Sequence, residues 1–129
     1  MWTFKQSTGQ LFDPFGVQVD LAWSGYGENR NKPELQNVPH IGCIPRGKYT
    51  IGKAYTSTTG LGKMVMNLEP FKENEMYGRS LFRFHGYKKD DPKTQTNESL
   101  LSSHGCIVTE YNIRVMINES EDKFLEVVW

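Results

Sequence analysis

The segment from Ser102 to Cys106 holds the densest group of side chains that could take part in covalent chemistry. It reads Ser-Ser-His-Gly-Cys, and its cysteine could act as a nucleophile because a thiolate attacks carbonyl groups. A second histidine, His85, could take the proton of this thiol and later protonate a leaving amine. The backbone N–H groups around Cys106 could stabilise an oxyanion. These residue types are those of a cysteine-dependent acyl-transfer site.

Each of these residues also has an ordinary structural explanation. A lone cysteine is more often a small buried apolar residue than a nucleophile. A histidine at the end of a strand is more often a hydrogen-bonded polar residue, and Ser-Ser-His-Gly can form a simple turn. Composition and periodicity alone therefore leave the function open.

The elements that would position these residues are predicted to be mostly β-strands. Apolar residues alternate near 17–23, 49–51, 64–68 and 81–85, and residues 124–129 are expected to form a last strand or a packed tail. The first strand would bury one face made of Val17, Val19, Leu21 and Trp23. In the fourth, Phe82 and Phe84 share a face, so the opposite face carries Leu81, Arg83 and His85.

One helix is predicted shortly after Cys106. Thr109 can cap it, Glu110 lies in its first turn, and an apolar stripe is formed by Ile113, Met116 and Ile117. The positive N-terminal end of this helix would favour a thiolate at Cys106. Two long polar segments, 24–42 and 86–102, are interpreted as functional or mobile loops, and the second could serve as a lid.

The bulk composition suits one domain, 1–129, and excludes several classes of protein. Fifteen basic and fifteen acidic side chains give a formal net charge of zero, which is unlike the basic footprint of a nucleic-acid binder. No apolar run is long enough to insert into a membrane, and the first residues lack the apolar core of a signal peptide. Two cysteines are too few for a disulfide framework.

The interval between the candidate base and nucleophile is the most specific feature of the chain. His85 is followed by residues 86–102 and then by Ser103-His104-Gly105-Cys106-Ile107. This order resembles the signature of the L,D-transpeptidase catalytic-domain family, in which His-Gly-Cys follows a Ser or Thr and precedes an apolar residue. The interval lies at the upper limit for that family. Ile44–Ile51 also resembles the family's Pro-x-Gly hairpin.

The wider layout is similar to the L,D-transpeptidase-like antibacterial effectors of type VI secretion systems. The similar segments are Trp2–Phe4, Ser7–Gly9, Ser24–Gly27, Asn37–Pro39 and Gly78–Ser80. The resemblance implies a β-rich L,D-transpeptidase-like sandwich or barrel with one short helix and no cofactor. It also implies synthesis in the cytoplasm without a signal peptide, delivery by the secretion machinery, action in the periplasm of a target bacterium and a cognate immunity protein.

The same resemblance implies roles for individual residues. Cys106 would attack the third residue of a peptidoglycan stem peptide and expel the terminal D-alanine, with His85 as base and the Gly86 carbonyl orienting the imidazole. Ser103 and His104 would line the site. The thioacyl group could then pass to water, to a free D-amino acid or into a cross-link. Substrate-binding residues would be Gly105, which leaves room beside the sulfur, and a carboxylate-binding arginine among Arg79, Arg83 and Arg114.

One departure and several alternatives accompany this interpretation. Val108 stands where the broad family usually has Asn or Arg, so a polar contact to substrate could be missing. His40, Cys43, His104 and Cys106 could instead form a structural zinc site, and the two cysteines could form a disulfide. An inactive wall-binding domain is a third alternative. A papain-like amidase is disfavoured because its cysteine precedes its histidine.

Overall fold

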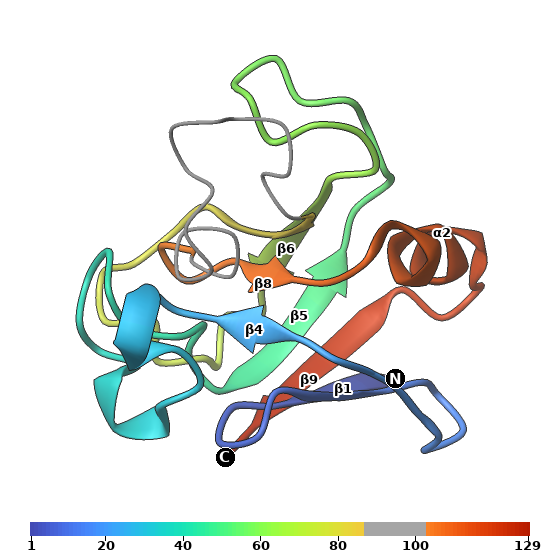
Figure 1. The fold of residues 1–129 in the computed structure, drawn as a ribbon. Helices are drawn as coiled ribbons and strands as arrows, with labels where there is room; N and C mark the ends of the chain where they lie inside the picture. The colour runs from blue at the N-terminus through green and yellow to red at the C-terminus, as the bar shows by residue number, and fades with distance from the viewer. Residues whose placement is uncertain (87–102) are drawn as a thin grey trace.

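Strands that are distant in the sequence become neighbours in a single mixed sheet. The computed structural model describes residues 1–86 and 103–129, and these residues contain nine strands and one α-helix (Figure 1). The sheet order is β3-β2-β1-β9-β5-β6-β7-β8-β4, and the sheet curls into a nearly closed barrel. Only the β1–β9 and β7–β8 pairs are parallel among these strands. The strands are β1 (Trp2–Lys5), β2 (Gln10–Phe12), β3 (Gln18–Leu21), β4 (Trp23–Ser24), β5 (Gly47–Ile51), β6 (Met66–Pro70), β7 (Phe82–His85), β8 (Ile107–Val108) and β9 (Phe124–Val128).

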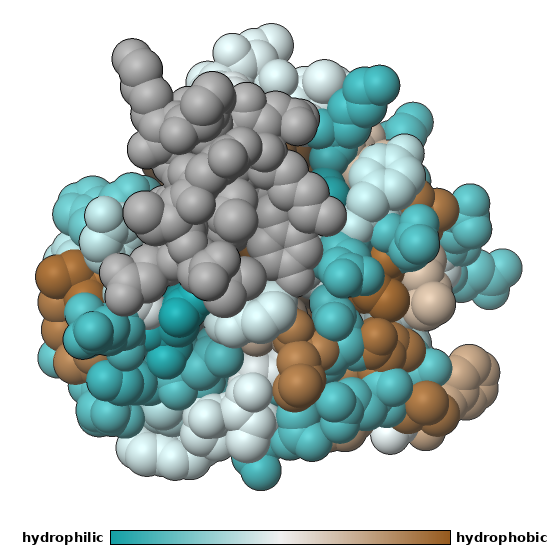
Figure 2. All heavy atoms as spheres, viewed as in Figure 1, coloured by the Kyte–Doolittle hydropathy of each residue, from teal (hydrophilic) through white to brown (hydrophobic). Residues whose placement is uncertain are grey.

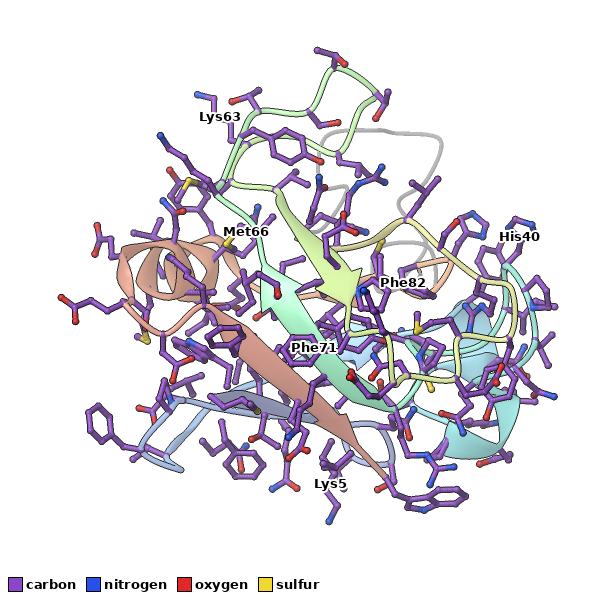
Figure 3. All side chains as sticks on the ribbon, turned by 180° about the vertical axis from the view of Figure 1, so that it is seen from behind. Lys5, His40, Lys63, Met66, Phe71 and Phe82 are labelled. Atoms are coloured by element: carbon purple, nitrogen blue, oxygen red, sulfur yellow. The ribbon has the colours of Figure 1, made fainter. Side chains whose placement is uncertain are left out.

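The core is built from alternate residues of the central strands. Seen from behind, β5 and β9 cross the molecule side by side, and their side chains project to both faces (Figure 3). This confirms the predicted strands near 49–51, 81–85 and 124–129, because alternation places one residue in two on the core face. The buried residues of these strands and of β6 are Tyr49, Ile51, Met66, Leu68, Phe82, Phe84, Leu125 and Val127.

The predicted buried face of residues 17–23 is wrong. Val17 and Leu21 are 58% and 52% exposed, and the fully buried residue here is Ala22. The alternation spans two strands: β3 ends at Leu21, and the chain then starts β4 at the other end of the sheet order. Because β3 is an edge strand paired only with β2, its apolar side chains have little to pack against.

The helix prediction is confirmed in its position but not in its cap. Helix α2 spans Tyr111–Glu119, its N-cap is Glu110, and no side chain makes a capping hydrogen bond. Thr109 is not the cap because its hydroxyl donates to Asp20. The stripe is only partly right, since Ile117 is buried and Ile113 packs against the core, whereas Met116 is 44% exposed.

The remaining elements are short and lie in the loops. Two 3₁₀ turns, η1 (Gly27–Asn29) and η2 (Pro33–Leu35), give structure to the predicted long loop 24–42. The predicted lid lies outside the described residues, except for Gly86. No helix in the described ranges is both long and apolar enough to cross a membrane. On the face shown in Figure 2, hydrophobic residues occur in separate groups among hydrophilic ones.

The parallel pairing of β7 with β8 positions the candidate site. Phe84 pairs with Ile107, and both side chains are buried in the core. Continuing this register by one residue places Arg83 beside Cys106, on the opposite face of the sheet. His85 follows on that same face of β7. The topology therefore brings the candidate base and nucleophile together although they are far apart in the sequence.

Candidate active site

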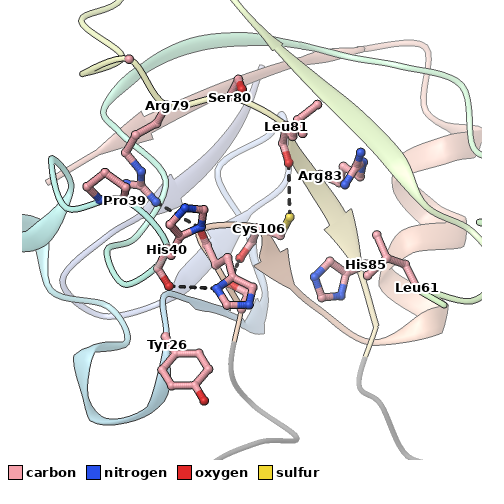
Figure 4. Close-up of a pocket in the computed structure, with 13 residues that line it drawn as sticks. Tyr26, Pro39, His40, Leu61, Arg79, Ser80, Leu81, Arg83, His85 and Cys106 are labelled. Atoms are coloured by element: carbon pink, nitrogen blue, oxygen red, sulfur yellow. Dashed lines mark hydrogen bonds between the residues drawn. The ribbon is translucent and has the colours of Figure 1, made fainter. Parts of the chain in front are cut away.

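A pocket opens on the face of the sheet that carries Arg83 and His85. The pocket is lined from several directions: by β7, by the segment that precedes it, by the loop before η1, by the loop after η2, and by the Ser103–Cys106 loop. Cys106 and His85 both line it: His85 ends β7, and Cys106 directly precedes β8 (Figure 4). Cys106 is partly exposed. The thiol is therefore accessible to a ligand in the pocket.

The His85 ring is oriented by the backbone. Its Nδ1 atom lies 2.9 Å from the carbonyl oxygen of Gly86, in the buried part of the site. Since a carbonyl can only accept, Nδ1 must carry the proton in this contact, and the lone pair of the neutral ring is then on Nε2. The Gly86 carbonyl thus selects the tautomer in which Nε2 can act as a base.

The surroundings of Cys106 favour its protonated thiol. Burial raises the pKa of Cys106, and the Arg83 backbone N–H together with the charges of Arg83 and Arg79 offsets only part of this effect. The thiol donates to the carbonyl oxygen of Leu81, at a distance of 3.7 Å between Sγ and oxygen. The predicted helix does not start beside Cys106, because the two residues of β8 intervene. A base beside Cys106 would therefore be needed to make its thiol nucleophilic.

Leu81 presents its carbonyl to the thiol from a strained backbone. Its φ is 67°, in the left-handed region that bulky residues rarely adopt. The Leu81 side chain is 73% exposed, so packing of that side chain does not account for the conformation. Strain of this kind is often found at functional sites. Here it directs a carbonyl oxygen toward Sγ of Cys106.

Ser103 holds the Ser103–Cys106 loop, which carries the candidate nucleophile. Its hydroxyl donates to the Cys106 carbonyl at 2.6 Å and accepts from the backbone N–H groups of Gly25 and Gly105. Ser24, which the sequence analysis missed, makes a second buried link: its hydroxyl donates to the Gly105 carbonyl and accepts from the Ile44 N–H. Ser103 lines the pocket, as expected, but its hydroxyl is already engaged in shaping this loop.

Arg79 connects the Ser103–Cys106 loop to the loop that follows η2. The buried guanidinium donates to four backbone carbonyls, those of Gln36, Gly42, Cys43 and His104, at 2.6 to 3.1 Å. Gly105 allows this arrangement, because a Cβ at that position would lie 2.6 Å from Nη2 of Arg79. The space beside Gly105, expected to receive substrate, is filled by Arg79 and Phe82. Arg79 lines the pocket, but the four N–H groups on its two terminal nitrogens donate to the protein.

We expect Arg79→Met to lower the free energy of unfolding by about 2–4 kcal/mol, because four carbonyls, three of them in buried hydrogen bonds, lose their donor. Arg79→Lys should recover part of this loss, since an ammonium keeps the charge but offers at most three donors. Chemical denaturation of the three proteins measures the difference. An unfolding free energy for Arg79→Met within 0.5 kcal/mol of wild type would contradict this role.

Arg114 is placed outside the pocket. Its guanidinium donates to the carbonyls of Thr109, Lys63 and Met64 and packs against Gly86, where a Cβ would lie 2.4 Å from Nη2. Arg114 therefore supports the Gly86 end of the site and has no contact with the cavity. Of the three arginines considered for carboxylate binding, Arg83 lines the pocket without a hydrogen bond from its guanidinium to the described residues.

Three rings form one wall of the pocket. His104 is stacked on Tyr26, with ring centroids 5.5 Å apart, and meets His40 edge-on at 5.9 Å. Nδ1 of His104 lies 2.9 Å from the His40 carbonyl oxygen, which orients the ring (Figure 4). His104 thus lines the site, as the sequence analysis expected, and it is held by its neighbours in the wall.

The zinc and disulfide alternatives find no support in the side-chain arrangement. Cys43 is fully buried, its thiol donates to the Lys32 carbonyl, and both Cys43 and Cys106 are free thiols. Within residues 1–86 and 103–129, no three His, Cys, Asp or Glu side chains are grouped as metal ligands. Cys106 is therefore the cysteine that a pocket ligand can reach.

Comparison with known proteins places this site in a family. The model of the family described as the Tlde1 domain matches residues 19–127, which contain the whole pocket. No curated protein matches the chain. The matched residues make up well over half of the sequence. The chain therefore belongs to the Tlde1-domain family of type VI secretion effectors, whose activity is of the L,D-transpeptidase type.

Proposed function

We propose that the protein is an L,D-carboxypeptidase of peptidoglycan tetrapeptide stems, which also exchanges the terminal residue for a free D-amino acid. The observation that carries this proposal is the β7–β8 pairing, which places Cys106 and His85 on one pocket. The contact between His85 Nδ1 and the Gly86 carbonyl supports a base at Nε2. The wider family context supports peptidoglycan as the target.

The first half-reaction forms a thioester. His85 Nε2 takes the proton from Cys106 as Sγ attacks the carbonyl carbon of the third stem residue, and the carbonyl oxygen gains negative charge. The tetrahedral adduct collapses by breaking the bond to the nitrogen of D-alanine. That nitrogen takes the proton from the His85 imidazolium and leaves as the amine. The acyl group remains on Cys106.

The second half-reaction repeats these steps with a new nucleophile. A water molecule gives its proton to His85, attacks the thioester carbon and releases a tripeptide stem, which restores the Cys106 thiol. The amine of a free D-amino acid can attack in the same way and gives an exchanged tetrapeptide. Both outcomes deprive the wall of the tetrapeptide donors used for cross-linking.

The proposed setting follows from the family. Type VI effectors are delivered by the secretion machinery and act in a target cell, and a producer of such a protein needs a cognate immunity protein. We propose the periplasm of a competing bacterium as the place of action and stem peptides as the substrate.

Purified tetrapeptide muropeptides provide the direct test. Incubation with the protein should convert them to tripeptides with release of D-alanine, and addition of an isotopically labelled D-amino acid should give the labelled tetrapeptide. Mass spectrometry measures both products. Unchanged muropeptides after incubation with folded protein would refute the proposal.

A further inference from the structure

Arg83 differs from the other two arginines near the site. Arg79 and Arg114 donate to four and three backbone carbonyls respectively. The guanidinium of Arg83 makes no hydrogen bond or ion pair with the described part of the chain, although its side chain lines the pocket. A guanidinium presents donors in a planar fork that fits a carboxylate with two parallel hydrogen bonds. Arg83 is thus equipped to bind an anionic group of a ligand.

The charge of the pocket favours such a ligand. No Asp or Glu is among its described lining residues, whereas two arginines and three histidines are. Among the lining residues that the structure describes, no carboxylate could compete with a ligand for Arg83. A site of one sign of charge attracts ligands of the opposite sign and orients them as they enter.

The register of β7 and β8 defines where a bound carboxylate would lie. Continuing the pairing of Phe84 with Ile107 by one residue places Arg83 beside Cys106, while His85 lies further along the same face of β7. Two residues along a strand span roughly 6.6 Å. A long arginine side chain can therefore reach a group bonded close to the atom that His85 protonates.

This spacing matches the leaving residue of the proposed reaction. The nitrogen that takes a proton from His85 and the terminal carboxylate of D-alanine are bonded to the same Cα. The other carboxylates of the stem lie on the acyl side of the cleaved bond, at the third residue or beyond it. With the third residue's carbonyl at Cys106 and the D-alanine nitrogen at His85, we expect the terminal carboxylate to lie within reach of the Arg83 side chain.

We propose that Arg83 binds the α-carboxylate of the terminal D-amino acid and thereby restricts the enzyme to the last residue of the stem. This inference rests on the proposed function. In exchange, the carboxylate of the incoming D-amino acid occupies the same position, so its amine faces the thioester. The enzyme would then act only on a stem with a free terminal residue. In a stem extended by one more residue, the terminal carboxylate would lie too far from the cleaved bond to bind Arg83.

Two substrates that differ only at the chain end provide the test. One is the tetrapeptide stem with a free terminal carboxylate, and the other is the same stem with a terminal carboxamide. We expect wild-type kcat/KM to be about 10- to 100-fold lower for the carboxamide, the range for loss of a hydrogen bond to a charged group. Arg83→Gln should lower kcat/KM for the free acid to a similar value and leave the carboxamide little changed.

Two further variants separate recognition from folding. Arg83→Lys should recover part of the preference for the free acid, because it keeps the charge but not the fork. Arg46→Gln removes an exposed arginine that lies over Trp129, outside the pocket, and should keep the full preference. Binding of both stems to Cys106→Ala, measured by calorimetry, should show tighter binding of the free acid by the same factor without any turnover.

The outcomes distinguish the two proposals. Equal cleavage of the free acid and the carboxamide by wild type would overturn the role of Arg83 and leave the carboxypeptidase activity intact. Failure to cleave either stem would instead refute the proposed function, and this inference with it. If folded Arg83→Gln still preferred the free acid, another residue would bind the terminal carboxylate, and the role proposed for Arg83 would be wrong.

Discussion

Cys106→Ala is expected to reduce D-alanine release from tetrapeptide stems by about 10⁵-fold or more, the scale seen when a covalent nucleophile is removed. Without Sγ the thioester cannot form, and water would have to attack the stem carbonyl directly. The fold should persist, because Cys106 is partly exposed and its thiol makes only a weak hydrogen bond, to the Leu81 carbonyl, within the described part of the chain. Mass spectrometry of the muropeptides and chemical denaturation measure the two effects separately.

Cys43→Ala is the matched control for this variant. It removes the other thiol, which is buried in the core and donates to the Lys32 carbonyl. Activity should survive, whereas the free energy of unfolding should fall by about 1–2 kcal/mol, because a small buried side chain is lost. Activity and stability together would then identify Cys106 as the reactive cysteine and Cys43 as a structural one. Normal activity in Cys106→Ala would rule out this thiol as the nucleophile.

The central strands of the sheet could be predicted because the alternate apolar residues of each strand all face the same core. Phe82 and Phe84 pack on one side of β7, so Arg83 and His85 had to face the other, as the structure confirms. Near Val17 the same rule failed, because the alternation crosses from one edge strand to another at Ala22. A period-two pattern predicts which face of its strand each side chain occupies. It does not say which strands have a neighbour on both sides.

The helix cap failed for a related reason. Thr109 satisfies the local rule for an N-cap, yet its hydroxyl donates to Asp20, a residue far away in the sequence. A local preference of this kind contributes about 1 kcal/mol, which a single tertiary hydrogen bond can outweigh. The partner of Thr109 comes from β3, so the helix pattern alone carried no sign of it.

The roles of the arginines could not be predicted either. A guanidinium that binds a ligand and one that binds backbone carbonyls look the same in sequence. The guanidinium of Arg79 donates to carbonyls of the loop that follows η2, and that of Arg114 donates to the carbonyls of Lys63 and Met64. Only the fold brings these partners together. The close contacts of these two guanidinium groups at Gly105 and Gly86 explain in physical terms why those positions hold glycine.

His85→Ala is expected to lower kcat/KM by about 10³- to 10⁴-fold and to change its pH dependence. In the mechanism we propose for the wild type, His85 takes the proton of Cys106 within the complex, so the thiol need not ionise beforehand. Without the imidazole, Cys106 must lose its proton to solvent. Burial raises the pKa of this thiol, so at neutral pH nearly all molecules of the variant are in the inactive protonated form.

The residual activity of His85→Ala should therefore rise with pH, by close to tenfold per unit, throughout the range below the raised pKa of Cys106. Wild type should lack this steep rise near neutral pH. His104→Ala is the matched control, because it removes a second imidazole from the pocket wall, and we expect a loss below about tenfold with the wild-type profile retained. Rates of thiol alkylation across the same pH range report ionisation of Cys106 without substrate. If His104→Ala, and not His85→Ala, produced the steep profile, the base would be the imidazole stacked on Tyr26, and the tautomer selected by the Gly86 carbonyl would have no part in the reaction.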